Sequence, residues 1–184
     1  MIQYLLANER TAQPWKNGGG VTREVAVWPP GADFETFEWR VSIATVDAEG
    51  PFSRFAGIDR VLTILNGRLI LQFDATETIS LSETSEPFEF SGETPYVGRP
   101  DRGAVVDLNV MVRRGRISAK VRRINQPAPL IGSANTLCLV ALDNCTINSE
   151  PLQPLDAITA ARGDRLDVNG PWPGLIAIDF ADIP

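Results

Sequence analysis

Histidine is absent from this chain of 184 residues. Zinc, iron, copper and nickel sites in proteins usually depend on imidazole or on several thiolates. The two cysteines, Cys138 and Cys145, cannot supply such a set, so we expect no transition-metal site and no cofactor. A hard cation held by carboxylates and carbonyl oxygens stays open. The same absence removes the Ser-His and Cys-His catalytic pairs and the usual general base at neutral pH.

Long apolar runs and a basic leader are also missing. No stretch approaches the roughly 20 apolar residues of a membrane span. Residues 1–10 lack the basic start and the small-residue cleavage site of a signal peptide. Both cysteines lie in a mostly apolar segment, which favours buried reduced thiols over a local disulfide. We therefore expect a cytoplasmic protein that does not enter a membrane.

Positive charge is scarce, since 17 Lys and Arg stand against 23 Asp and Glu, giving a net charge of −6. Nucleic-acid binding needs a basic face that neutralises phosphates, so no nucleic-acid partner is expected. Lysine occurs only at Lys16 and Lys120, and the other basic residues are arginines. Arginine suits bidentate binding of carboxylate or phosphate. Most of these arginines are expected on solvated strand faces, where arginine is ordinary. The partner expected for this chain is a small anionic metabolite, which the remaining arginines would bind.

Apolar and polar residues alternate with a period of two along most of the chain, which predicts β-strands. No segment has a helical period for more than a turn or two. Asn66-Gly67 is the strongest short-range signal for a β-hairpin. Short strands at this spacing predict a sandwich or barrel. The predicted strands are 21–28, 39–46, 61–65, 69–73, 105–112, 117–121, 137–142, 156–159, 166–168 and 175–180.

The strand rhythm restarts after Arg113-Arg114-Gly115-Arg116. This restart predicts two halves, residues 1–113 and residues 114–184. A strand, a Gly-Asp turn at Gly163-Asp164 and a further strand near the end form a pattern seen in cupin barrels and in many other β-barrels.

Three consecutive glycines follow Trp15-Lys16-Asn17. Glycine permits positive φ and a close approach of backbone amides to a ligand. A phosphate-binding loop is disfavoured, because the Gly-Lys-Ser/Thr ending is missing and a strand follows where a helix should begin. The segment is either a structural turn or a turn that also lines a pocket.

Two strands carry an unusual polar face. Alternation places Arg40, Ser42 and Ala44 on one face of residues 39–46, which is either a wet face or a cavity wall. Residues 105–113 place Asp107, Asn109, Met111 and Arg113 together, on an exposed strand or on a polar cavity wall. The intervening loop, residues 50–60, contains two phenylalanines and Arg-Asp-Arg charges, which indicates a loop packed against the body.

Taken in order, these segments resemble the HutD/Ves family, which is tied to histidine utilisation and stress-induced proteins in bacteria. The resemblance covers about the first two-thirds of the chain. The matching residues are Trp15-Lys16-Asn17-Gly18-Gly19-Gly20, Thr22-Arg23-Glu24, Trp39-Arg40, Ser42, Ala44, Gly50-Pro51-Phe52-Ser53, Phe55, Gly57, Asp59-Arg60, Leu65, Gly67, Asp107, Asn109, Met111 and Arg113.

The resemblance implies an all-β, double-cupin fold with two barrel-like halves and a ligand pocket in the first half. Metal-using cupins carry a histidine-rich motif that this chain lacks. Formylglutamate-like or urocanate-like carboxylates are the ligands that the family implies. The ligand-binding residues expected on this basis are Lys16, Asn17, Arg23, Glu24, Arg40, Ser42, Ser53, Asp59, Arg60, Asp107, Asn109 and Arg113.

Three functions fit the sequence. The favoured one is a non-catalytic, metal-free binding or regulatory protein for a small carboxylate. The second is a cupin-type isomerase or lyase, in which Glu24, Asp107, Lys16 or Tyr96 would transfer protons. The third is an interaction protein whose edge strands meet a partner, a homodimer included. Turnover of a candidate ligand separates the second from the first, and the oligomeric state tests the third.

Overall fold

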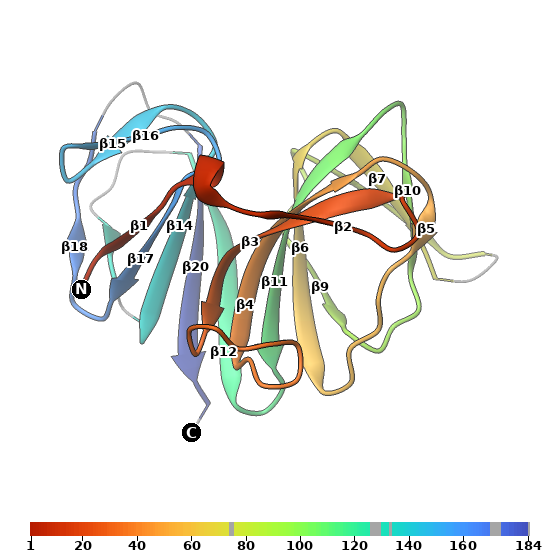
Figure 1. The fold of residues 1–184 in the computed structure, drawn as a ribbon, viewed down its shortest axis with the longest axis horizontal. Coiled ribbons are helices and arrows are strands. Elements are labelled where there is room, and N and C mark those ends of the chain that lie inside the picture. The colour runs from red at the N-terminus through yellow and green to blue at the C-terminus, as the bar shows by residue number, and fades with distance from the viewer. Residues whose placement is uncertain (74–75, 126–129, 133, 170–173, 184) are drawn as a thin grey trace. The chain divides into compact units, whose positions relative to one another are not determined.

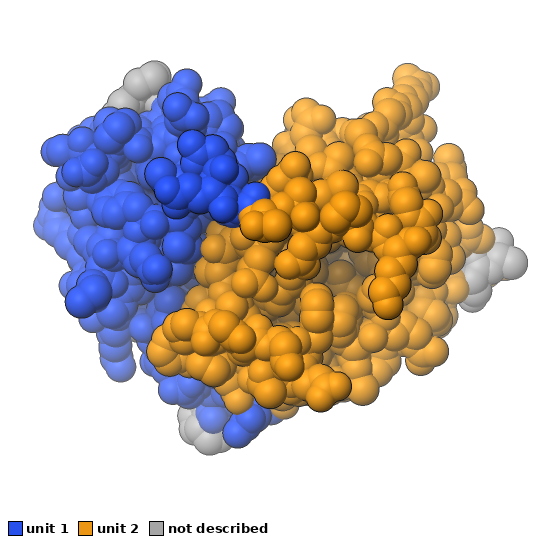
Figure 2. Space-filling model, in the orientation of Figure 1, with its two compact units in different colours: residues 1–10, 115–184 blue, residues 11–114 orange. Residues whose placement is uncertain are grey.

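The computed structural model describes residues 1–73, 76–125, 130–132, 134–169 and 174–183. In this part of the chain nearly all regular structure is β, and the helical element is a short 3-10 turn, η1 (Ala7–Glu9). The expected all-β class is therefore confirmed. No helix in these ranges is long and apolar enough to cross a membrane. The chain divides into two compact units, one of residues 11–114 and one of residues 1–10 with 115–184 (Figure 2).

The unit of residues 11–114, called unit 2, contains two antiparallel sheets (Figure 1). The larger has the order β2-β3-β4-β11-β6-β9, and the smaller has the order β5-β10-β7-β8. The larger sheet contains β2 (Ala12–Pro14), β3 (Gly20–Trp28), β4 (Trp39–Val46), β11 (Val105–Arg113), β6 (Ile58–Asn66) and β9 (Phe88–Ser91). The smaller contains β5 (Gly50–Pro51), β10 (Val97–Pro100), β7 (Arg68–Gln72) and β8 (Thr78–Ser82).

The prediction of a β-hairpin at Asn66-Gly67 is wrong. β6 ends at Asn66 and β7 begins at Arg68, yet β6 pairs with β11 and β9 while β7 pairs with β10 and β8. Gly67 does adopt a positive φ of 87°, as a turn glycine should. Its single-residue connection carries the chain from one sheet to the other, and the strand partners lie elsewhere in the sequence.

The two sheets of unit 2 share an apolar core at one end of the larger sheet. Strands β4 and β11 contribute one residue each and β6 contributes two alternate residues, and the smaller sheet covers them. Because alternate residues of a strand point to the same face, the core residues share a face with the polar residues farther along these strands. The buried core consists of Val46, Leu62, Ile64, Leu69, Leu71, Leu81, Tyr96 and Val105.

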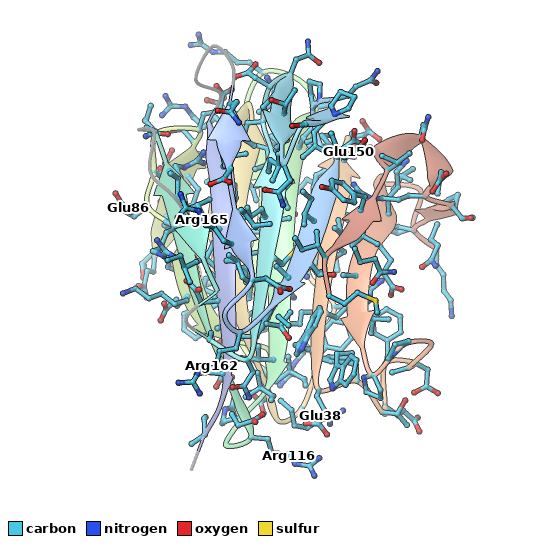
Figure 3. All side chains as sticks on the ribbon, turned by 90° about the vertical axis from the view of Figure 1, so that its left-hand side faces the viewer. Glu38, Glu86, Arg116, Glu150, Arg162 and Arg165 are labelled. Carbon is cyan, nitrogen blue, oxygen red and sulfur yellow. The ribbon has the colours of Figure 1, made fainter. Side chains whose placement is uncertain are left out.

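Unit 1, which holds residues 1–10 and 115–184, contains a five-stranded antiparallel sheet and two smaller sheets. The side chains of Arg162 and Arg165 in this unit are exposed (Figure 3). The five-stranded sheet has the order β1 (Gln3–Leu5), β17 (Ala157–Ala161), β14 (Thr136–Ala141), β20 (Leu175–Asp182) and β12 (Ile117–Ile124). The others are β13 (Leu130–Ile131) with β18 (Arg165–Leu166), and β16 (Glu150–Leu152), β15 (Cys145–Ile147) and β19 (Val168–Asn169).

The first strand explains the composition of unit 1. β1 pairs with β17, with Gln3 opposite Thr159, so residues 1–10 cluster with the second part of the chain. The halves expected from the sequence, 1–113 and 114–184, differ from these units mainly in that segment. In the same unit Cys138 and Cys145 are buried and unpaired, which agrees with the expectation of reduced thiols. Burial raises the pKa of the Cys138 thiol to about 12.

Candidate functional site

Unit 2 contains a cavity of about 670 Å³ on the inner face of its larger sheet. This volume is in the range of small-molecule sites. Its floor comes from the central strands β4, β11 and β6. Its walls come from the end of β2 and the turn after it (residues 13–17), from Phe34, and from the end of β5 and the loop after it (residues 51–55). Figure 2 shows a hollow in the surface of this unit. The lining residues are Gln13, Pro14, Trp15, Lys16, Asn17, Thr22, Phe34, Arg40, Ser42, Ala44, Pro51, Phe52, Ser53, Phe55, Arg60, Asp107, Asn109 and Met111.

Strand register places the polar floor residues in rows. β11 is paired on both sides, with β4 and with β6, so residues opposite one another share a face. Both polar strand faces noted in the sequence therefore line the same cavity. The rows are Arg40, Met111 and Arg60; then Ser42 and Asn109; then Ala44 and Asp107.

Arg60 is a buried guanidinium held by the cavity floor. Its Nε and Nη2 donate to Asn109 Oδ1 at 3.1 and 3.0 Å, and its Nη1 donates to the Ser53 carbonyl oxygen at 3.2 Å. The rings of Phe90, Phe52 and Phe55 lie 4.9, 5.4 and 5.7 Å from its Cζ. Burial lowers the pKa of Arg60 to about 10, Asp107 opposes that change and Arg40 adds to it. Arg60 therefore stays charged at neutral pH.

Arg40 is the second buried guanidinium. Its Nε donates to Glu24 Oε2 at 2.8 Å, and its Cζ lies 4.6 Å from the centre of the Phe34 ring. Among the described residues, nothing accepts a hydrogen bond from its two terminal nitrogens. A guanidinium has five N–H donors, so four of them remain for a ligand or water in the cavity.

Asp107 is the acidic side chain in the cavity lining. It is 3% exposed and accepts no hydrogen bond from any residue that the structure describes. Burial raises the pKa of Asp107 to about 7, and the charge of Arg60 acts in the opposite direction. Asn109 and Ser42 lie beside it on the floor and are also buried. Buried polar groups normally have partners, so this floor is shaped to receive polar atoms of a ligand or water.

The three consecutive glycines, residues 18–20, belong to the turn that joins β2 to β3 in the larger sheet. Gly18 has a φ of 71°, and its N–H donates to the Trp15 carbonyl oxygen at 3.0 Å. A Cβ at Gly20 would lie 2.4 Å from the Thr45 carbonyl oxygen, so only glycine fits there. Asn17 Oδ1 accepts a hydrogen bond from the Gly19 N–H at 3.1 Å. The turn is therefore structural, and it also places the cavity-lining residues before the glycines.

Four of the residues expected in the site do not line the cavity. Glu24 lies next to it and binds Arg40, whereas Arg23 is exposed on the opposite face of β3. Asp59 accepts a hydrogen bond from Arg114 Nε at 2.8 Å on the surface of the unit. Arg113 donates to the carbonyl oxygens of Phe37 and Glu35, and it holds the loop between β3 and β4. The other eight expected residues all line the cavity.

Phe34 is a cavity residue that the sequence reasoning missed. It stacks on Phe55, with ring centres 5.5 Å apart, and covers Arg40. The nearby turn is fixed by Asp33 Oδ1, which accepts hydrogen bonds from the Thr36 hydroxyl and from the backbone N–H of Glu35. The spacing Asp33-Phe34-Glu35-Thr36 is a local turn signal, and it could have indicated a projecting aromatic residue.

The described ranges contain no group of three or more His, Cys, Asp or Glu side chains arranged to hold a metal ion. The cavity itself offers one carboxyl, Asp107, beside two guanidinium groups and Lys16. Cationic neighbours disfavour a bound metal cation and favour an anion. The donor set therefore does not fit the resident metal that many cupin-type proteins hold.

Comparison with known proteins shows the family to which this chain is similar. A family model described as HutD matches residues 7–175. Protein Ves of Citrobacter koseri is 32% identical over 140 residues, which cover 76% of this chain and 72% of that protein. HutD from Pseudomonas fluorescens SBW25 has 28% identity and a TM-score of 0.87, with full coverage of both chains.

More distant structures show the fold alone. YhhW from Escherichia coli has 12% identity and a TM-score of 0.66, and the match covers 100% of this chain and 98% of that one. YhhW and the other distant structural neighbours are of cupin type, so this chain has an all-β fold of that type. Within the described residues no sheet closes into a barrel. Because the family match extends over most of the chain, we conclude that this chain belongs to the HutD family.

Proposed function

We propose that this protein binds a small carboxylate in the cavity of unit 2 and acts as a non-catalytic, metal-free binding or regulatory protein of the HutD/Ves type. In this proposal the two units correspond to two cupin-like halves, and the N-terminal half, which is unit 2, holds the site. Formylglutamate-like and urocanate-like molecules are the candidate ligands.

The observation that carries the proposal is the pair of buried arginines with unused donors. Arg40 keeps both terminal nitrogens for a ligand, and the bonds of Arg60 to described residues leave one N–H on each of its terminal nitrogens. Arg40 already has the Glu24 carboxylate as a partner, and the two guanidinium groups on one floor together attract a further anion to the space between them. A carboxylate, with four lone-pair positions, is an anion of this kind.

The energetics are adequate for a metabolite-binding protein. A hydrogen bond to a charged group contributes about 1.5–3 kcal/mol. Two or three such bonds support micromolar affinity, about −8 kcal/mol, once the apolar contacts of Phe52 and Phe55 are added and ordering costs are subtracted.

A second candidate function is a cupin-type isomerase or lyase. One observation favours it: Asp107 has a raised pKa near 7, which suits a group that exchanges protons at neutral pH. Of the other groups that could transfer protons, Lys16 lines the cavity, whereas Glu24 is bound to Arg40 and Tyr96 lies in the apolar core. Turnover of a bound carboxylate by the purified protein would replace the binding proposal with this one.

The test of the proposal is a thermal-shift screen of the purified protein with formylglutamate, glutamate, formate, urocanate and imidazolepropionate, each with and without a chelator. A ligand that binds only the folded state stabilises it by about 2.7 kcal/mol at a hundredfold excess over its Kd. A chelator-insensitive shift for one carboxylate supports the proposal. A flat screen removes these ligands, and a shift that needs added metal contradicts the metal-free site.

A further inference from the structure

The two arginines account for the binding of an anion, but they do not explain why the cavity floor also contains the buried carboxyl of Asp107. It lies on the central strand of the floor, between Ala44 of β4 and Ile64 of β6. Its side chain lines the cavity, is almost completely buried and has no hydrogen-bond partner among the described residues. A buried charged group without hydrogen-bond partners is costly. The role of Asp107 therefore depends on whether its carboxyl is ionised or protonated when a ligand is bound.

The charged groups that line the same cavity are cationic. They are Arg40 on β4, Arg60 on β6 and Lys16 in the turn after β2. Glu24 of β3 lies beside them, and its carboxylate accepts a hydrogen bond from Arg40. In the ligand-free cavity burial raises the pKa of Asp107 to about 7, and the charge of Arg60 opposes this rise and favours the ionised form.

A bound carboxylate changes this balance. Its negative charge lies against Arg60 and offsets the attraction that favours the ionised form of Asp107. It also repels a second carboxylate at short range, and both effects favour the protonated form. A protonated carboxyl gains an O–H donor, which an ionised one lacks.

We propose, building on carboxylate binding at this site, that Asp107 binds the ligand as a neutral carboxyl and donates its O–H to the anion, so that the site takes up a proton with the carboxylate. The net ligand is then the equivalent of a neutral carboxylic acid. One oxygen of the ligand accepts from guanidinium, and the other accepts from Asp107.

The spacing of the floor fits such a bridge. The hydrogen bonds of Arg60 to Asn109 hold its guanidinium beside that residue. Asp107 is the next residue on the same face of β11, so its Cα lies about 7 Å from that of Asn109. A carboxylate with one hydrogen bond of about 2.7–2.9 Å at each oxygen can join groups on residues at this backbone spacing.

The experiment is isothermal titration of the full-length protein with formate at pH 7.5, in HEPES buffer and in Tris buffer at equal ionic strength. Formate has no N–H donor and stays ionised at this pH, so a proton taken up enters the protein. The difference in binding heat between the two buffers gives the number of protons taken up. With a pKa near 7 in the free protein, linkage predicts an uptake of about 0.8 proton per formate at this pH. Zero uptake, or release of a proton, overturns the inference.

Affinity measured against pH gives a second readout. The Kd for formate should rise by up to about tenfold per pH unit above pH 7, because the binding form of Asp107 becomes scarce. A Kd that is constant between pH 6 and pH 8.5 contradicts proton uptake.

Three variants assign the proton. Asp107→Asn keeps a donor and a similar shape, and it should bind formate without proton uptake and with a pH-independent Kd. Asp107→Leu removes the donor, and wild-type affinity in this folded variant would refute donation by Asp107. Lys16→Met should weaken binding but keep the proton uptake. Loss of uptake in Lys16→Met, with its persistence in Asp107→Asn, would overturn the assignment to Asp107.

Failure of this inference can be told apart from failure of the carboxylate-binding proposal. Formate binding without proton uptake refutes only the role of Asp107. Absence of binding for formate and formylglutamate at every pH from 6 to 8.5 refutes carboxylate binding itself, and the role of Asp107 with it.

Discussion

Replacing Arg40 with methionine is the most direct test of the site, because it removes the donors at little structural cost. Arg40 makes one hydrogen bond to a described residue, from its Nε to Glu24. The Glu24 side chain is 38% exposed, so its carboxylate regains water when the guanidinium is removed. Methionine keeps most of the apolar stem that packs under Phe34.

The expected size of the effect follows from these contacts. We expect a change in the free energy of unfolding of less than about 1 kcal/mol, as is usual for a partly exposed ion pair. For the ligand, the loss of a charge-assisted hydrogen bond costs about 1.5–3 kcal/mol. Since each 1.4 kcal/mol is a factor of ten, Arg40→Met should weaken carboxylate binding by about 10- to 150-fold.

The assay is isothermal titration with formate and formylglutamate, alongside urea denaturation of each variant. Arg99→Met is the matched control, because Arg99 belongs to the same unit, lies outside the cavity and is half exposed, 3.9 Å from Glu49. The control should bind as the wild type does. If Arg40→Met is folded and its Kd lies within twofold of the control, the guanidinium does not hold the ligand and the site is misplaced.

Three further predictions concern Asp107, Arg113 and the thiols. Burial raises the folded-state pKa of Asp107 to about 7, so the folded state holds a proton that the unfolded chain loses at lower pH. The stability of the wild type therefore falls as the pH rises from about 4 to 7. The gain in Tm of Asp107→Asn over the wild type should therefore be larger at pH 8 than at pH 5, and an equal difference at both would contradict the burial argument. Arg113→Met should lower the free energy of unfolding in urea by about 1–3 kcal/mol, because it loses hydrogen bonds to loop carbonyls, while the Kd for formate stays within twofold of wild type. Cys138 and Cys145 should react with a colorimetric thiol reagent only after unfolding in urea, and rapid reaction of the native protein would show that the thiols are accessible.

The sequence alone predicted the long strands, because alternation is a local property, but it missed nine shorter ones in the described part of the chain: β1, β2, β5, β8, β9, β10, β13, β15 and β16. Each strand range expected from the period-2 pattern overlaps an observed strand, and β4 matches its expected bounds, residues 39–46. Alternation also grouped Arg40 with Ser42, and Asp107 with Asn109, on the same faces. The absence of histidine is likewise a property of the sequence, and it favours arginines over metal ligands as the chemistry of the site.

Tertiary structure decided which polar residues face the cavity. Arg113 has the same parity on β11 as Asp107 and Asn109, so the sequence treats them alike. At the end of the strand, however, the loop before β4 offers carbonyl oxygens, and Arg113 binds these. The hairpin prediction at Asn66-Gly67 failed for a related reason, because β6 pairs with β9 and β11, which lie farther along the chain, and not with the adjacent β7. Pairing and loop packing depend on residues far apart in the chain, and a local pattern carries no information about them.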